Sequence, residues 1–164
     1  MLAGLHLAAC NPARHSPYMD LKGDLSMTGL PKKMEHQPPM ARPAISTEAV
    51  HAGFRAVFRI FEQWHLSGEE GMILLGRPAR STYYGWRQGK IGTVPNDTVD
   101  RISLLLGIYK NIQLLMTDTN LADRWVREPN RAFGGQSALQ RMLAGQMMDL
   151  AAVRSYLDAA RGVW

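Results

Sequence analysis

The sequence predicts an all-α protein preceded by a flexible leader. Three observations lead to this prediction: apolar residues recur at spacings of three and four after residue 45, capping patterns and glycine stops punctuate that region, and no strand pattern occurs in it. Residues 1–44 lack these features. They hold six prolines without sustained periodicity, so they are expected to bury too little apolar surface to offset their ordering entropy.

Composition narrows the function classes. The 164 residues carry a net charge of +5, which favours an anionic partner such as nucleic acid. Cys10 is the only cysteine, so no intramolecular disulfide forms, and a cytoplasmic location is expected. Residues 5–10 look like the end of a lipoprotein signal, but they lack a basic segment and a full apolar one. An early translation start or a disordered leader are the alternatives. No apolar run approaches the roughly 20 residues of a membrane helix.

The first two expected helices have clear boundaries. Ser46 is a candidate N-cap, and Ser67 with Glu70 forms a capping box that starts a helix of about two turns. Gly76 supplies the left-handed stop of that second helix. The apolar face of the first helix consists of Val50, Phe54, Val57, Phe58, Phe61 and Trp64.

A third helix is expected over residues 79–88, with basic and hydroxyl groups on one face and Tyr83 and Trp86 turned to the core. A short capped helix, a turn and a second helix with such groups outward is typical of a helix-turn-helix, whose second helix enters the major groove. The alternative is a solvated basic helix of an ordinary bundle. Gly85 inside the helix and the absence of a capping side chain before it keep that alternative open.

The third helix ends at Gly89, and a long helix should follow. Pro95 starts this fourth helix, with Gly107 as a candidate break. The exposed side of residues 108–116 is a candidate dimer contact or part of the core. The apolar stripe comprises Val99, Ile102, Leu105, Leu106, Tyr109, Ile112 and Leu115. Residues 45–116 are therefore expected to form one helical domain and residues 117–164 a second.

The second domain is predicted to hold three helices. The first carries Leu121, Trp125 and Val126 and is ended by Pro129. The second helix begins at a capping box of Ser137 and Gln140 and stops at Gly145. The last helix is capped by Asp149 and ends at Gly162, with Val163 placed to fold back on Leu157. Its apolar residues are Leu150, Val153, Tyr156 and Leu157.

The glycine pair Gly134 and Gly135 precedes the second of these helices. A phosphate-binding loop would need a lysine and a hydroxyl residue directly after the glycines, and a dinucleotide fingerprint would need a strand before them. Neither is present. The pair is therefore interpreted as a sharp turn between helices, with Phe133 facing inward.

An ordered set of segments resembles the Xre/MbcA/ParS antitoxins of bacterial toxin-antitoxin systems. The segments are LSGEEGMILLG, STYYGWRQGK, DRISLLLGIYKNI, W..EPNRAFGGQSAL and VRSYLDAARGVW, over about residues 60–164. The resemblance implies an Xre-like helix-turn-helix domain that binds operator DNA, and a small toxin-binding domain. It also implies a homodimer and a toxin of the RES or ADP-ribosyltransferase-like type that consumes NAD, whose pocket the antitoxin occludes.

The resemblance assigns two sets of site residues. DNA binding falls on Arg80, Ser81, Thr82, Tyr84, Arg87 and Lys90. Toxin binding falls on Asn130, Arg131, Phe133, Gln146, Met147, Arg154, Arg161 and Trp164. The alternative for Trp164 is a ring packed on its own domain, and Met147 and Met148 are adaptable contacts or core. Two positions depart from the family: Ala138, where proline is common, and Gly85, where a basic residue is common.

Three other functions remain open. The protein could be a stand-alone transcription regulator without a toxin, or an interaction module that has lost DNA binding. An enzyme has poor support, because the histidines do not pair on one helix face, metal-ligand spacing is absent, and Glu69 and Glu70 are explained by a capped helix start. No cofactor or metal is expected.

Overall fold

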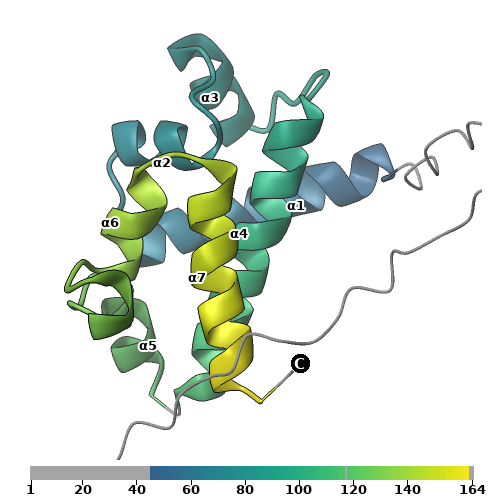
Figure 1. Cartoon of the computed structure of the whole chain (residues 1–164). Helices are drawn as coiled ribbons and strands as arrows, with labels where there is room; N and C mark the ends of the chain where they lie inside the picture. Colours follow the sequence, from purple (N-terminus) through teal and green to yellow (C-terminus); the bar gives the residue numbers. More distant parts are fainter. Residues whose placement is uncertain (1–44, 117, 163–164) are drawn as a thin grey trace, which may run out of the picture. The chain divides into compact units, whose positions relative to one another are not determined.

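The computed structural model describes residues 45–116 and 118–162. These ranges hold seven α-helices and one 3-10 turn, and their only β pairing is a single bridge between Pro129 and Ser137. The predicted all-α class is confirmed (Figure 1). The predictions for the leader, for Val163 and for Trp164 fall outside the described residues.

The first helix, α1 (Thr47–Gln63), begins and packs as its sequence predicts. The Ser46 hydroxyl accepts a hydrogen bond from the Ala49 N–H at 3.2 Å, which satisfies one of the free donors of the first turn. Phe54, Val57, Phe58, Phe61 and Trp64 are all buried.

The next two helices are α2 (Gly68–Leu74) and α3 (Arg80–Arg87). The capping box at the start of α2 is confirmed: the Ser67 N–H donates to Glu70 Oε2 at 2.7 Å, and the Glu70 N–H donates to Ser67 Oγ at 3.2 Å. Gly76 follows the C-cap of α2. Its φ of +89° lies in the left-handed region that glycine favours, and this conformation stops the helix. Arg77 follows it at φ +58°.

The long helix α4 (Asn96–Leu115) differs from its prediction in two ways. It runs without interruption through Gly107, so the candidate break does not occur. Leu115, expected in the buried stripe, is exposed at the C-terminal end of the helix, where fewer neighbours cover the last residue. Polar residues also occur on the buried side, among them Asn111 between Ile108 and Ile112.

The remaining elements are α5 (Thr119–Trp125), the 3-10 turn η1 (Arg131–Phe133), α6 (Ala138–Leu143) and α7 (Met147–Ala160). The capping box of Ser137 and Gln140 and the stop at Gly145 are confirmed. Asp149 was wrongly predicted to cap α7. Gln146 occupies the cap, and Asp149 is the third residue of the helix, where its Oδ2 accepts from the Gln146 N–H at 3.1 Å.

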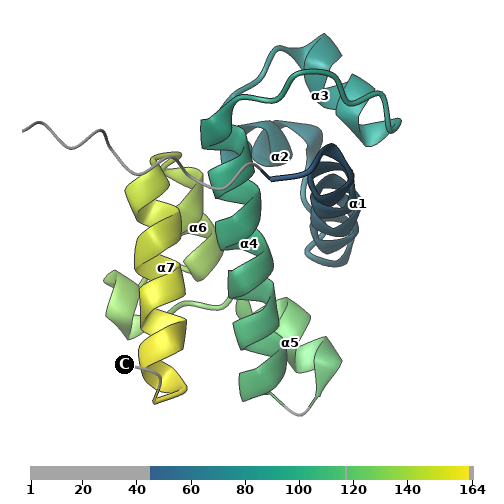
Figure 2. The same cartoon turned by 90° about the vertical axis from the view of Figure 1, so that its right-hand side faces the viewer.

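The helices pack around α4. In Figure 2, α4 lies between α7 and α1, and α7 runs alongside α4 in both views. The helix α6 packs against α7 and α2, while α3 packs against α1. The described residues belong to one compact unit. Its buried core is continuous from Phe54 and Val57 through Leu105, Ile108 and Ile112 to Leu139, Leu150 and Val153.

Candidate functional site

The helix α3 lies at one end of the molecule, at the top of Figures 1 and 2. Tyr83 and Trp86 are buried against α1, as predicted. The opposite side carries the residues predicted to bind DNA: Tyr84 is half-buried, and Arg80, Ser81, Thr82, Arg87 and Lys90 are exposed. The structure therefore brings these six side chains to one end of the molecule.

Two glycines of α2 allow α3 to approach closely. A Cβ atom at Gly71 would collide with the Tyr83 hydroxyl and would lie 3.2 Å from Phe61. A Cβ atom at Gly68 would lie 2.7 Å from the Tyr84 hydroxyl. Burial raises the pKa of the Tyr83 phenol above its usual value, because a low-dielectric environment disfavours the charged form. The two tyrosine hydroxyls thus determine how α2 and α3 pack.

Both arginines that are predicted to bind DNA already form contacts within the chain. The guanidinium carbon of Arg80 lies 5.5 Å from the centre of the Tyr84 ring, within the range of a cation–π contact. Nη2 of Arg87 lies 3.5 Å from Glu62 Oε1 on α1. Both side chains of that ion pair are largely exposed, so the pair contributes little to stability.

An aromatic cluster joins the last elements. The Tyr156 ring of α7 stacks on Trp125 of α5, with centroids 6.3 Å apart and an interplanar angle of 8°. The Phe133 ring of η1 meets Tyr156 edge-on, with centroids 5.1 Å apart. Phe133 and Trp125 are half-buried, and Tyr156 is 36% exposed. The cluster therefore reaches the surface.

The glycine pair turns the chain next to this cluster. Gly134 and Gly135 have φ values of +68° and +85°. The Asn130 backbone oxygen accepts from the N–H of Gly135 at 3.0 Å, and its Oδ1 accepts from the N–H of Ala132 at 2.9 Å. The predicted turn is confirmed, and Phe133 faces the core as expected.

Four polar side chains hold α7 on α4. Asn111 is fully buried. Its Nδ2 donates to Asp158 Oδ1 at 2.6 Å, while Arg161 Nη1 donates to Asn111 Oδ1 at 2.5 Å. Arg154 Nε donates to the other carboxylate oxygen of Asp158 at 2.8 Å. These bonds, that from Arg154 first and that from Asn111 next, hold the Asp158 pKa below its usual value.

The same network explains the glycine in α4. A Cβ atom at Gly107 would occupy the space of the Arg154 guanidinium. A residue predicted to break the helix instead lets an arginine of α7 lie across it. Arg154 and Arg161, predicted as contacts to a toxin, thus also make contacts within the chain.

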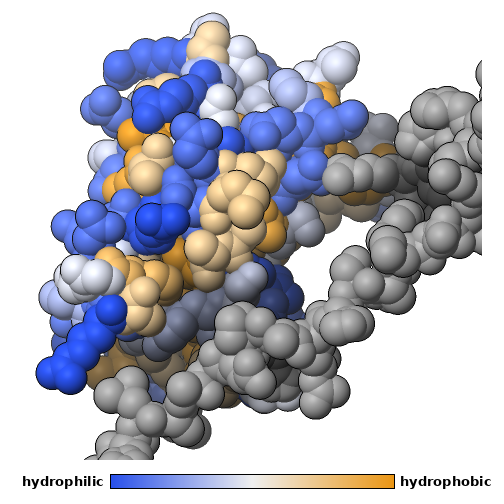
Figure 3. All heavy atoms as spheres, viewed as in Figure 1, coloured by the Kyte–Doolittle hydropathy of each residue, from blue (hydrophilic) through white to orange (hydrophobic). Residues whose placement is uncertain are grey.

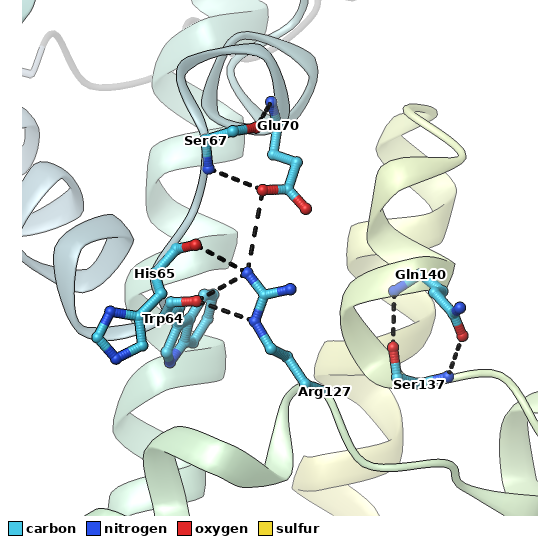
Figure 4. A network of polar contacts seen from close by, with 7 residues as sticks. All are labelled: Trp64, His65, Ser67, Glu70, Arg127, Ser137 and Gln140. Atoms are coloured by element: carbon cyan, nitrogen blue, oxygen red, sulfur yellow. Dashed lines mark hydrogen bonds and ion pairs between the residues drawn. The ribbon is translucent and has the colours of Figure 1, made fainter.

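Arg127 links the segment after α5 to the end of α1 (Figure 4). Its Nη2 donates to the backbone oxygens of Trp64 at 3.0 Å and His65 at 2.9 Å, and its Nε donates to Trp64 at 3.1 Å. Nη2 also lies 3.9 Å from Glu70 Oε2, the atom that accepts from the Ser67 N–H. A cation here caps the negative end of the α1 dipole and contacts the start of α2.

Figure 3 shows the face on which α7 lies. Hydrophobic residues gather in the middle of this face, while the end that carries α3 is mostly hydrophilic. Met148, near the start of α7, is 74% exposed, and Leu114 and Leu121 are 58% and 52% exposed. Exposed apolar residues of this kind often mark a protein–protein contact when they are contiguous.

The C-terminal part of the chain matches a known domain. Residues 113–162 match the antitoxin Xre/MbcA/ParS C-terminal toxin-binding domain. A protein of Sinorhizobium fredii, called uncharacterized protein y4oB, is 45% identical over 120 residues, which cover 73% of this chain and 92% of that protein. This chain belongs to the Xre/MbcA/ParS antitoxin family. Its family identifies it as a regulatory, toxin-binding protein.

The toxin-binding domain of this antitoxin extends from the last turn of α4 to just past α7. Trp164 lies outside the described residues. Of the other residues predicted to bind a toxin, Asn130, Phe133, Met147 and Arg154 are half-buried, and Arg131, Gln146 and Arg161 are exposed. Only some of them come together: Phe133 joins the aromatic cluster, Arg154 bonds Asp158, and Arg161 bonds Asn111.

Sequence reasoning missed Arg127, Asn111 and Asp158. The spacing of Arg154 and Asp158, i and i+4, was a readable signal for an ion pair, and a lone amide between two buried isoleucines was a signal for Asn111. Nothing local marks Arg127, whose partners lie more than sixty residues earlier. No helix in the described ranges is long and apolar enough to cross a membrane, and these ranges hold no cluster of metal-binding side chains.

Proposed function

We propose that this antitoxin uses its C-terminal toxin-binding domain to occlude the active site of a NAD-consuming toxin. We also propose that it represses its own operon by binding operator DNA with α3. The partner toxin would be of the RES or ADP-ribosyltransferase-like type. The observation that carries the proposal is the toxin-binding match over residues 113–162. The cytoplasm, where such a toxin would act, is the proposed location.

The side chains on the surface of the toxin-binding domain support the dinucleotide-binding pocket of a toxin as the target. Such a pocket accepts phosphates and flat rings. Arg131 and Arg161 carry exposed guanidinium groups, and the cluster of Trp125, Phe133 and Tyr156 offers aromatic rings in the same domain. Arginine and aromatic residues are the usual anchors of tight interfaces. Arg161 is bound to Asn111, so part of the entropy cost of ordering it is already met.

Co-expression with the adjacent open reading frame, with rescue of growth as the readout, tests the proposed toxin binding. A chain that ends at Gly162 keeps every described contact but lacks Trp164, and we expect it to lose rescue of growth. Met148→Glu should also weaken rescue, because it places a charge on the exposed start of α7. Ser103→Glu, at an exposed position of α4 outside the matched domain, adds the same charge and should leave rescue intact. Full rescue by both test variants would contradict the assignment.

The proposed DNA binding depends on the exposed side of α3. Arginine can bond guanine edges in the major groove, and each good bidentate pair is worth about 1 to 3 kcal/mol of discrimination. Arg80→Ala should therefore weaken binding to the promoter region upstream of the gene and relax its specificity, as measured by fluorescence anisotropy. Binding to that region without capture of a co-expressed toxin would instead favour a stand-alone regulator. Absence of DNA binding even at low salt would favour an interaction module.

A dimer would supply the second half of the DNA contact. In the segment 108–116 proposed for the dimer, Ile108 and Ile112 are buried, but Leu114 and Leu115 are exposed. Two α3 helices held about 34 Å apart would meet successive turns of the major groove and require a palindromic operator. Leu114→Glu should therefore convert the dimer to a monomer in sedimentation velocity and weaken operator binding. A wild-type chain that sediments as a monomer at micromolar concentration would contradict this contact.

A further inference from the structure

A basic hollow lies between α1 and the end of α3. It has a volume of about 240 Å³, and its lining includes Arg55, Arg59 and Glu62 of α1 together with Trp86, Arg87 and Gly89 of the third helix region. Three guanidinium groups thus face one carboxylate. Glu62 is paired with Arg87 at 3.5 Å, so it is not available to neutralise the other two arginines.

No hydrogen bond or ion pair among the described residues accounts for Arg55 and Arg59. Both are exposed and lie one turn apart on the same face of α1. Neither forms an ion pair within the part of the chain that the structure describes. Two unpaired cations placed side by side repel each other, and an anion bound between them would relieve that repulsion.

The position of the hollow indicates the source of the anion. It adjoins the carboxyl-terminal end of α3, close to Arg87 and Gly89. A helix that enters a groove of DNA is flanked by two rows of phosphates, so basic groups beside the helix meet the backbone. We infer that Arg55 and Arg59 of α1 bind phosphates of the operator duplex beside α3. This inference rests on the proposed DNA binding and extends it to a helix outside the helix-turn-helix.

Salt dependence of DNA binding tests the inference. The logarithm of the binding constant falls with the logarithm of salt concentration by about 0.9 for each phosphate contact. Arg55→Gln with Arg59→Gln should reduce the magnitude of that slope by about 2 and lower affinity for the operator and for an unrelated duplex by similar factors. Phosphate contacts carry no direct sequence information, so the ratio of the two affinities should stay the same.

Two further variants sharpen the test. Arg124→Glu makes the same change in net charge on α5, at the opposite end of the molecule from α3 in both views (Figures 1 and 2), and should leave the slope unchanged. Glu62→Gln removes the carboxylate of the hollow and frees Arg87, so it should tighten binding and steepen the slope. Circular dichroism of each variant checks that the helices remain.

The possible results separate the inference from the function on which it rests. If the wild-type chain binds duplex and the double variant keeps the wild-type slope, the inference is wrong while operator binding stands. An equal loss of affinity in Arg124→Glu would mean a net-charge effect and would also overturn it. If the double variant loses binding to anionic vesicles but not to duplex, the hollow serves a membrane surface and the inference fails. A wild-type chain that binds no duplex overturns both.

Discussion

Two glycines inside helices of this antitoxin differ in what approaches them. Gly107 and Gly85 both lie inside helices, where glycine is less favourable than alanine. At Gly107 the Arg154 guanidinium occupies the space that a Cβ atom would need. At Gly85 the nearest atom would be the Lys90 carbonyl oxygen, at an ordinary 3.7 Å. At Gly107 the missing side chain leaves room for an arginine of α7, whereas at Gly85 a methyl group would meet nothing closer than an ordinary contact.

Alanine should have opposite effects at these two glycines. Gly85→Ala is expected to stabilise the protein by up to about 1 kcal/mol through helix propensity. Gly107→Ala should destabilise it, because Arg154 must leave Asp158 or α7 must move away from α4. Urea unfolding of both variants measures the difference. Equal stabilisation by both substitutions would show that the approach of Arg154 is not needed.

Asp158 should make stability depend on pH in the acid range. Its pKa is lowered in the folded state by Arg154 and Asn111, so the folded state binds fewer protons than the unfolded state between the two pKa values. The stabilisation is therefore complete above the unfolded pKa of about 3.9 and is lost as pH falls through the lower folded pKa. Asp158→Asn should be less stable than wild type at pH 7.

The difference in free energy of unfolding between wild type and Asp158→Asn should shrink below about pH 4. Glu128→Gln is a suitable control, because Glu128 is exposed and forms no ion pair within the described ranges. That variant should track wild type more closely across the range. A difference for Asp158→Asn that does not change with pH would argue against the carboxylate network.

At the scale of elements, helix ends are capped in two ways. Local capping boxes, Ser67 with Glu70 and Ser137 with Gln140, cap the starts of α2 and α6. Arg127, which is distant in the sequence, caps the end of α1. Figure 4 shows both kinds of cap. A local cap strengthens one helix, whereas a distant cap also fixes the relative position of two helices.

Removal of the distant cap should therefore cost more than removal of an ordinary surface charge. Arg127→Gln is expected to lower the free energy of unfolding by about 1 to 3 kcal/mol, since hydrogen bonds from a charged group to helix-terminal carbonyls are lost. Arg124→Gln, an exposed arginine one turn earlier, should change stability by at most about 0.5 kcal/mol. Chemical denaturation compares the two, and equal values would contradict the capping role.

At the scale of the molecule, α4 belongs to both halves of the chain. It packs on α1 with one side and on α7 with the other. Arg101, buried in α4, donates from Nη1 to the Gly145 backbone oxygen at 3.1 Å and from Nε to Asp97 at 2.7 Å. The division at residue 116 remains a prediction, but the core itself runs across that position.

A shared core should make the antitoxin unfold as one unit. Circular dichroism at far-ultraviolet and near-ultraviolet wavelengths should report coincident thermal transitions. Val153→Ala, in α7, should destabilise α1 as well as α7 by about 1 to 2 kcal/mol through the lost methyl groups, which amide hydrogen exchange would detect in both helices. Two separated transitions would instead show that the halves fold independently.

Sequence alone determined the helical class, most helix starts and the residues that face the core. These follow from short-range rules: a serine accepts from an N–H three residues on, a left-handed turn favours glycine, and a 3.6-residue period puts one stripe inward. The ordered family segments were likewise readable, and the match over residues 113–162 supports them.

Only the tertiary structure decided what the polar residues on those helices do. Gly107 receives an arginine instead of breaking α4, Asp149 lies inside α7 instead of capping it, and Arg127 caps a helix that ended more than sixty residues earlier. The physical reason is range. A cap or a helical stripe depends on neighbours within one turn, whereas the partner of a buried amide, or of a guanidinium lying on another helix, depends on how distant helices pack.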